Sequence, residues 1–540
     1  MPRAASEALS YLLSSNAVPN TYESASVQLE VDHLASQIAQ LRTKLEKLEE
    51  RFRSYSAVLS PIRRVPAEIW GEILTFVIPD DVLEQKKRLH LVDLQLVCKA
   101  WREAARLKHR LWSGLYIDLH QNIPLKEIEC WFGRSGNIPK SLEVSIPGHE
   151  DCESQDSPCR LHSPALATLL AEGPLGRFSL TCQSSQCFQN LLDALKTVEA
   201  KPNHCAWDCL NFMALKFSEE WNESPDPSKS IFFHLPPNIT SFELELPARG
   251  DEFWFGFDPT TTPLHIPPSF LEQLNSLSLR SDWQGLKWLE CILPFCINVQ
   301  TLKFNFDGMY WEYDADGNYN HVQQRLHSGF LLPKVRTLRL QHIGAYSRSM
   351  DILSFIITPQ LFDLDISFQE NNVADWDWEL AEDVLSFVKR SNCEAALRCF
   401  RLRHFQADAQ QLADTLHGLP LLTHVTLEAT AMAKISDAFS RLHFRDVHNL
   451  PHLETLELLN LKPHFGCYSL LDVLRWRAPY RWDDNYRPLP GAPPYTLKKL
   501  TVTYQTITKE KEWLATHLFI QALRKWSGVS VHIGPVTYVD

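Results

Sequence analysis

The N-terminal part of the chain carries apolar residues that are spaced alternately four and three positions apart. They are Val27, Val31, Leu34, Ile38, Leu41, Leu45, Leu48, Phe52, Tyr55 and Leu59. Because this seam continues over more than four heptads and is flanked by charged residues, it predicts a coiled-coil helix over 27–60. Pro61 ends the helix, since a proline disfavours helical conformation at the residue before it. Residues 1–26 are small and polar, and we expect a disordered tail there.

A narrow apolar stripe on a helix has to be covered by another surface. Two arrangements satisfy this requirement for residues 27–59. In the first, two copies of the chain form a homodimer, either parallel or antiparallel. In the second, the helix folds back onto its own chain or stays a marginally stable single helix, and the heptad pattern alone does not distinguish these outcomes.

Residues 61–119 form a predicted all-α block of three amphipathic segments. The first begins at Pro66, because a proline at the start of a helix lacks only an N–H that would have no partner anyway. Its apolar positions are Ile69, Ile73, Leu74 and Val77. The second segment is a helix from Leu91 to Trp101, and the third ends at Trp112. The block holds more apolar surface than a module of this size buries, which indicates an interface.

One pattern, apolar-x-x-apolar-x-apolar, recurs over the remainder of the chain. Its copies start at Trp112, Leu175, Phe212, Ile239, Leu274, Val299, Val335, Leu361, Leu397, Leu422, Leu453 and Leu497, with a poorer copy at Pro139. Most intervals between them alternate near 26 and 36 residues. The residue between the last two apolar positions is polar in nearly every copy, as Lys216 is in the copy at Phe212, and this alternation predicts strands with one buried face.

Helical patterns lie between these triplets, for example over residues 286–293 and 381–390. Each repeat is therefore predicted to be one strand and one helix, which cannot bury its apolar face alone but does so when stacked on its neighbours. A stacked array grows without needing a new core for each addition. The whole chain is expected to be α/β, with most of its length in this array.

Composition narrows the range of functions. The chain has 540 residues, of which 44% are hydrophobic and 22% are charged, as in an ordinary globular protein. A net charge of −12 argues against general nucleic-acid binding, which needs a basic footprint. No uncharged run reaches the ~18 residues of a membrane helix, so no membrane association is expected. The 13 cysteines indicate free thiols in a reducing compartment, and we expect the protein in the cytoplasm, the nucleus or both.

Motifs for catalysis or cofactor binding are not found in the sequence. It contains no phosphate-binding glycine loop, no H-E-x-x-H and no G-x-S-x-G, so we predict a non-enzyme without cofactors. One stretch concentrates residues that could bind zinc: His149, Cys152, Cys159, His162, Cys182, Cys187, His204, Cys205 and Cys209. No pair has the C-x₂-C spacing of a structural zinc site, so we expect ordinary thiols and no metal.

The helical block resembles an F-box. The resemblance rests on VPAEIWGEILTFV at 65–77, LQLVCKAWREAA at 94–105 and the closing Leu111-Trp112. Val65 replaces the usual leucine, and the connection over 79–90 is longer than the family norm. The heptad helix that runs into SPIRRVPAEIW is similar to the N-terminal layout of fungal, mushroom-type F-box proteins.

This resemblance implies a partner and a set of contact residues. F-box helices dock on a SKP-family adaptor, which connects them to a cullin scaffold and its RING subunit. By motif position, the adaptor-binding residues would be Pro66, Ile69, Leu74, Leu96, Val97 and Trp101. The domains would be an F-box at 61–119 and, since the downstream repeats resemble leucine-rich repeats, a solenoid at 120–540.

An F-box before leucine-rich repeats implies the substrate-recognition subunit of an SCF-type E3 ubiquitin ligase, which is not itself catalytic. The alternative is a leucine-rich-repeat scaffold without a ligase, in which the helical block only caps the repeats. A substrate surface is predicted on the polar side of the strands. Its basic residues are Arg280, Lys303, Arg339, Arg401 and Arg403. They favour an acidic or phosphorylated protein segment, although Asp365 lies among them.

Overall fold

A computed structural model of the chain describes residues 10–15, 17–79, 82–119, 125–146, 159–171, 175–199, 209–221, 226–247, 264–280, 286–306, 329–344, 348–369, 380–405, 409–430, 432–445, 450–461, 497–505 and 530–535. The chain divides into two compact units. The first, which we call the helical unit, comprises residues 1–79 and 90–108, and the second, the sheet unit, comprises residues 80–89 and 109–540. The predicted α/β class with a long N-terminal helix is confirmed.

The long N-terminal helix, α2 (Thr21–Leu59), begins before the predicted start at Val27. The side chain of Asn20 accepts hydrogen bonds from the backbone N–H groups of Tyr22 and Glu23. The carboxylate of Glu23 in turn accepts one from the backbone N–H of Asn20, at 2.9 Å. This capping box satisfies N–H groups that the first turn of a helix leaves without partners, and it therefore fixes the start of the helix.

The predicted disordered tail over residues 1–26 is wrong for part of that range. Residues 10–15 are helical, and residues 21–26 form the first turns of α2. The heptad pattern could not reveal these turns, because a helix that starts at a cap does not need an apolar seam there. At the other end, α2 stops at Leu59 before Pro61, as predicted.

Short helices make up the rest of the helical unit. They are a 3₁₀ turn at Pro61–Arg64, α3 (Ala67–Val77), α4 (Gln85–Val97) from residue 90 onward, and α5 (Lys99–Leu107). Their buried side chains include Leu74 of α3, Leu91 of α4 and Ala104 of α5. The indole rings of Trp70 and Trp101 lie 4.8 Å apart between their centroids. Aromatic contact of this kind contributes stabilisation beyond that from the area the two rings bury.

The single helix predicted from Leu91 to Trp101 is two helices in the structure. Cys98 has an extended backbone, with φ −163° and ψ 169°, so α4 ends at Val97. The Cys98 carbonyl then accepts a hydrogen bond from the Arg102 N–H at 3.2 Å and starts α5. The apolar spacing continues across this break, which is why the sequence pattern did not show it.

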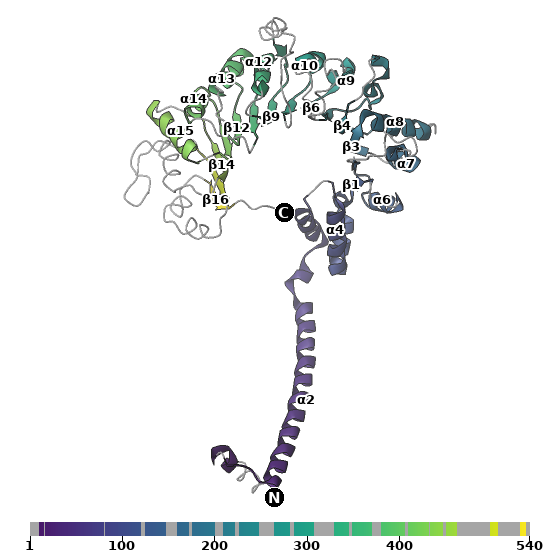
Figure 1. Ribbon diagram of the computed structural model, residues 1–540, viewed down its shortest axis with the longest axis vertical. Helices are drawn as coiled ribbons and strands as arrows, with labels where there is room; N and C mark the ends of the chain where they lie inside the picture. The colour runs from purple at the N-terminus through teal and green to yellow at the C-terminus, as the bar shows by residue number, and fades with distance from the viewer. Residues whose placement is uncertain are drawn as a thin grey trace, which may run out of the picture. The chain divides into compact units, whose positions relative to one another are not determined.

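A fourteen-stranded sheet forms the centre of the sheet unit, and its strands follow one another in chain order. The strands are β1 (Gly114–Asp118), β2 (Lys140–Ser145), β3 (Leu175–Ser184), β4 (Phe212–Glu220), β5 (Ser241–Glu245), β6 (Ser276–Arg280), β7 (Thr301–Asn305), β9 (Thr337–Ile343), β11 (Asp363–Phe368), β12 (Cys399–Arg403), β13 (His424–Glu428), β14 (Thr455–Leu461), β15 (Lys499–Tyr504) and β16 (Ser530–Pro535). Neighbouring strands are parallel throughout, and the sheet is curved (Figure 1). A separate pair, β8 (Phe330–Leu331) and β10 (Ile356–Ile357), is also parallel.

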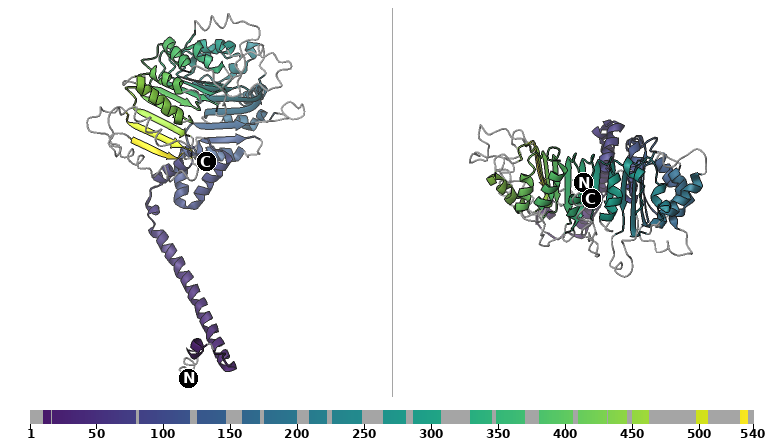
Figure 2. Two further views of the ribbon diagram at one scale, coloured as in Figure 1. Left: turned by 60° about the vertical axis from the view of Figure 1, so that its left-hand side comes forward. Right: turned by 90° about the horizontal axis from the view of Figure 1, so that it is seen from above.

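Helices cover the outer side of this curve, and the strands line its inner side (Figures 1 and 2). The α-helices are α6 (Leu125–Phe132), α7 (Pro164–Ala171), α8 (Ser185–Glu199), α9 (Pro268–Gln273), α10 (Leu286–Ile292), α12 (Ile352–Phe355), α13 (Leu380–Ser391), α14 (Ala409–His417) and α15 (Met432–Arg445). Side-chain alternation explains the arrangement. In β12, Phe400 and Leu402 are buried, whereas Arg401 and Arg403 are partly exposed on the other face. We call that second face the inner face.

Each predicted triplet, including the poorer one at Pro139, coincides with a strand. The register predicted for the copy at Phe212 is wrong, however. Met213 and Leu215 are aligned with Phe242 and Leu244 of β5, so the mid-strand residue is Ala214 and not Lys216. The strand β16 was missed because its apolar pair, Val531 and Ile533, is not preceded by an apolar residue at the first triplet position.

The predicted helical block at 61–119 contributes to both units. Strand β1 is the first strand of the sheet, although its residues lie within that block. Leu83 forms an isolated parallel bridge with Leu115 of β1, and its carbonyl accepts a hydrogen bond from the Tyr116 N–H at 3.1 Å. The edge of the sheet is thereby partly paired, which protects it from pairing with another chain.

Candidate functional site

Helix α3 has two apolar sides, and only one of them is covered. Trp70 and Leu74 point into the helical unit and are buried. Ile69, Ile73 and Phe76, at positions i, i+4 and i+7, form a second row that is exposed, with Phe76 83% exposed. We call this row the α3 stripe. A soluble helix normally keeps such a row against a partner, because exposed apolar area of this kind is unfavourable in water.

Helix α4 presents a similar set of residues. Leu91 is buried, whereas Val92, Leu96 and Val97 are exposed, with Leu96 66% exposed. We call these three residues the α4 set. Together with the α3 stripe they make the helical unit unusually rich in exposed apolar side chains. Clusters of this kind mark protein–protein contacts.

The predicted adaptor-binding residues fall into three groups. Ile69, Leu96 and Val97 are exposed, and so is Pro66, which occupies the N-cap position of α3. Trp101 is partly exposed because its ring packs against Trp70. The prediction for Leu74 is corrected, since a side chain that is 1% exposed cannot contact a partner.

Sequence reasoning did not single out Ile73, Phe76 and Val92, which the structure shows as exposed apolar residues beside the predicted ones. The signal was present, because Ile73 and Phe76 follow Ile69 at helical spacing. Only the structure distinguishes the covered row of α3 from the exposed one.

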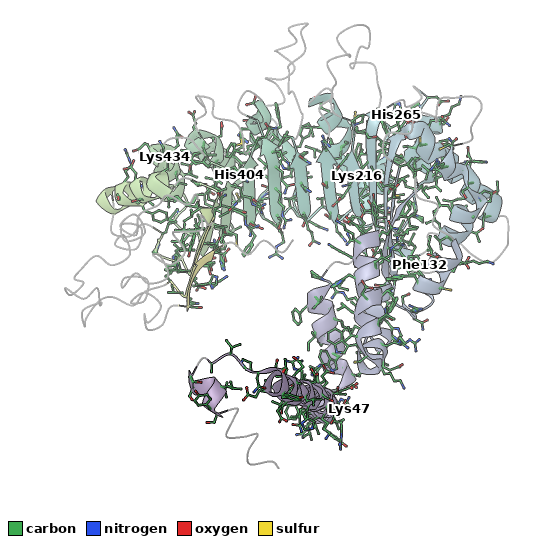
Figure 3. The ribbon with its side chains drawn as sticks, turned by 60° about the horizontal axis from the view of Figure 1, so that its bottom comes forward. Lys47, Phe132, Lys216, His265, His404 and Lys434 are labelled. Carbon is green, nitrogen blue, oxygen red and sulfur yellow. The ribbon has the colours of Figure 1, made fainter. Side chains whose placement is uncertain are left out.

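The inner face of the sheet carries a row of aligned residues, one from the middle of each strand. In strand order from β5 to β14 they are Glu243, Ser278, Lys303, Arg339, Asp365, Arg401, Thr426 and Glu457. We call this row the inner ladder. The parallel register sets their order. Lys216 lies on β4, the strand before β5, and His404 directly follows β12 (Figure 3).

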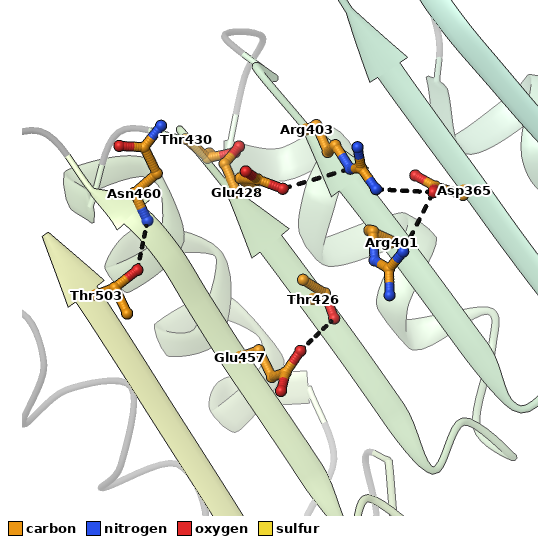
Figure 4. A network of polar contacts seen from close by, with 9 residues as sticks. All are labelled: Asp365, Arg401, Arg403, Thr426, Glu428, Thr430, Glu457, Asn460 and Thr503. Carbon is orange, nitrogen blue, oxygen red and sulfur yellow. Dashed lines mark hydrogen bonds and ion pairs between the residues drawn. The ribbon is translucent and has the colours of Figure 1, made fainter. Parts of the chain in front are cut away.

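Asp365 holds the arginines that follow it in the ladder. Its carboxylate Oδ2 accepts a hydrogen bond from Arg401 Nη1 at 3.3 Å and another from Arg403 Nη2 at 3.0 Å (Figure 4). Asp365 is only 2% exposed. Arg403 Nε also lies 3.4 Å from Glu428 Oε2. Two arginine charges are therefore balanced within the sheet by two carboxylates.

This arrangement changes the predicted substrate surface. Arg401 and Arg403 lie together, as expected, but their charges are taken up by Asp365 and Glu428. Arg280 is aligned with Glu245, which also forms an ion pair with Lys216 at 3.4 Å. These three predicted cations consequently lie next to acids of the sheet.

Lys303 and Arg339 differ from Arg401 and Arg403 in forming no ion pair, although Arg339 is aligned with Asp365 of β11. They are directly opposite each other on β7 and β9, and Arg339 is exposed. Within the described residues, neither side chain forms an ion pair or a hydrogen bond. Like charges in register on neighbouring strands repel each other, and an anion placed between them would relieve this repulsion. We call these two residues the cation pair.

The cysteines that the structure describes differ in their burial and their neighbours. Burial raises the pKa of the Cys296 thiol and of the Cys393 thiol to about 12. The Cys187 sulfur lies 3.5 Å from the Ser184 hydroxyl, in the stretch considered for zinc. No three His, Cys, Asp or Glu side chains gather closely enough for a metal ion in the described ranges. His149, Cys152, His204 and Cys205 lie outside the described residues.

No protein-family model matches the chain, and no curated protein matches it either. In the part of the chain that the structure describes, no helix has both the length and the apolar character needed to cross a membrane. The two surfaces, on the helical unit and on the inner face, therefore have to be interpreted from their own chemistry.

Removing the carboxylate of Asp365 should destabilise the sheet unit. We expect Asp365→Ala to lower the free energy of unfolding by about 2–3 kcal/mol, because Arg401 and Arg403 lose their shared counter-charge. The matched control is Asp437→Ala, which breaks an exposed pair with Arg441 on α15 and should cost less than about 0.5 kcal/mol. Urea denaturation of both variants measures the difference, and equal costs would show that the buried cluster is not stabilising.

Alkylation should separate the buried thiols from the exposed ones. At about pH 8 a thiol with a raised pKa is almost entirely protonated and reacts slowly. We therefore expect iodoacetamide to modify Cys98 and Cys130, which are exposed, well before Cys296 and Cys393. Mass spectrometry of peptides measures the rates, and denaturation in urea should make all four similar. Equal rates in the folded protein would contradict the burial of Cys296 and Cys393.

Proposed function

We propose that the protein is the substrate-recognition subunit of an SCF-type E3 ubiquitin ligase. In this proposal the F-box segment at 61–119 docks on a SKP-family adaptor, and the downstream strands and helices are a leucine-rich-repeat solenoid that binds a protein substrate. The chain catalyses no reaction itself. It holds the substrate near the ubiquitin-transferring subunits and so raises the effective concentration of acceptor lysines.

The observation that carries this proposal is the exposed apolar surface of the helical unit. Three residues that the F-box motif assigns to the adaptor, Ile69, Leu96 and Val97, belong to the α3 stripe or the α4 set. Phe76 extends the α3 stripe by a further turn. A surface that matches the motif positions and has no cover from its own unit supports docking of a partner with an apolar groove.

The strand order supports the repeat part of the proposal. Parallel strands in chain order with helices on the outer side fit a stacked array, in which each repeat contacts its neighbours. Such arrays bind partners on the face that the strands line. The side chains of the cation pair, Lys303 and Arg339, form no ion pair among the described residues, and this supports a substrate segment that is acidic or phosphorylated.

A second candidate is a leucine-rich-repeat scaffold that works without a ligase. One observation favours it: Leu83 pairs with Leu115 of β1, so part of the predicted F-box segment covers the first edge of the sheet. In this alternative the helical block only caps the repeats. The two candidates differ in whether the exposed residues of α3 and α4 bind an adaptor.

Charged substitutions on the helical unit distinguish these candidates. We expect Ile69→Asp with Leu96→Asp to abolish co-purification with a SKP-family adaptor, because a buried carboxylate in an apolar contact is strongly unfavourable. Both positions are exposed in the isolated chain, so folding should be retained and circular dichroism should be unchanged. The matched control, Phe233→Asp, alters an exposed apolar residue of the sheet unit and should bind normally. If the unaltered chain fails to bind the adaptor, the scaffold is favoured.

Charge reversal on the inner face tests the substrate class. We expect Lys303→Glu with Arg339→Glu to weaken binding of a fluorescent polyglutamate or phosphoserine-rich peptide by about tenfold or more, since two charge-assisted contacts are lost. The control, Lys389→Glu with Lys434→Glu, makes the same charge change on the outer helices α13 and α15 and should bind as the unaltered chain does. Fluorescence anisotropy measures both. Equal losses in the two variants would indicate only a long-range charge effect.

A further inference from the structure

Helix α2 is long and has no buried residue along its whole length. From Val27 to Leu59 it rises roughly 48 Å, at about 1.5 Å per residue. Its seam residues from Val31 onward are exposed, including Leu34, Leu41 and Leu48. Helices in proteins gain most of their stability from packing of an apolar face, so this seam needs a cover. Within the described residues, the chain does not provide one.

The residue types in the seam indicate what that cover is. The spacing places Val31, Ile38, Leu45, Phe52 and Leu59 at the a positions of a heptad and Val27, Leu34, Leu41, Leu48 and Tyr55 at the d positions. The first two of these a positions are β-branched, and the central three d positions are leucine. This combination favours two helices that run parallel to each other.

The flanking charges also fit a parallel pair in register. In that arrangement the residue at a g position lies next to the residue at the following e position of the other helix. Lys44 occupies a g position and Glu49 the following e position. Each copy therefore contributes one Lys44 next to the Glu49 of the second copy, and the twofold symmetry makes two attractive pairs. The remaining g and e pairs place no like charges together.

An antiparallel pair with the whole seam covered is unfavourable by the same criterion. In that arrangement g positions meet g positions and e positions meet e positions. The centre of the seam would then place Lys44 next to Lys44 and Arg42 next to Arg42, and both contacts are repulsive. A shift of one heptad in either direction leaves two seam residues of each copy uncovered. The charges thus select the parallel pair.

We propose that α2 forms a parallel, in-register, two-stranded coiled coil with α2 of a second copy of this chain. The protein is then a dimer that carries two helical units and two inner faces. A partner with two acidic segments would bind it more tightly than it binds a single chain, because the second contact becomes intramolecular. The inference rests on α2 alone and holds whether or not the helical unit binds an adaptor.

The mass of the full chain in solution tests the dimer. Light scattering should give twice the 62.2 kDa of one chain across the micromolar range. Leu41→Asp with Leu48→Asp places charge in the seam and should give the mass of one chain. The matched control, Gln40→Asp with Thr43→Asp, adds the same charge on the outer side of α2 and should remain dimeric. A monomeric unaltered chain would overturn the proposal, and so would equal dissociation of the two variants.

A cross-link tests the orientation. Ser24 lies one heptad before Val31 and therefore at an a position, near the start of α2. In the parallel dimer, Ser24→Cys brings two thiols into disulfide range, and mild oxidation should give a covalent dimer on a non-reducing gel. The unaltered chain under the same oxidation is the control for its native cysteines. In an antiparallel dimer the two residues lie at opposite ends, so a dimer that does not cross-link through Ser24→Cys would overturn the parallel arrangement.

Discussion

The alternation of apolar and polar side chains along parallel strands is the constraint on which the sheet unit depends. Because successive side chains point to opposite faces, Phe400 and Leu402 are buried under the outer helices and Arg401 stays on the inner face. The register between strands then aligns inner residues into a ladder. Packing of the buried side chains fixes this register, and the register sets the order of charges on the inner face, including the cation pair of Lys303 and Arg339.

Burial also explains why the inner face is not uniformly basic. A carboxylate that is only 2% exposed needs a counter-charge, and Asp365 meets this need by holding Arg401 and Arg403. In the helical unit, by contrast, it is apolar side chains that remain exposed. Its small core accommodates Leu74 but leaves Ile69 and Phe76 in water, so apolar area remains for a partner.

Features with a local cause could be predicted from the sequence, and features that depend on distant residues could not. The strands follow from period-two alternation. In β4, however, a register that starts at Phe212 fitted the triplet as well as one that buries Met213, and only the pairing with β5 decided between them. The break between α4 and α5 at Cys98 leaves the apolar spacing uninterrupted, so the sequence pattern did not show it. The environment of Arg401 depends on Asp365, which lies 36 residues away in the chain and was recognised only as a conflicting charge.

The central claim is that the exposed apolar residues of α3 and α4 are a docking surface for a SKP-family adaptor. Hydrogen–deuterium exchange of the full chain, with and without the purified adaptor, tests it most directly. Backbone N–H groups over 69–77 and 92–97 should exchange more slowly in the complex, while those of strand β12 should not change. Unchanged exchange over both helices in a mixture with saturating adaptor would contradict the claim.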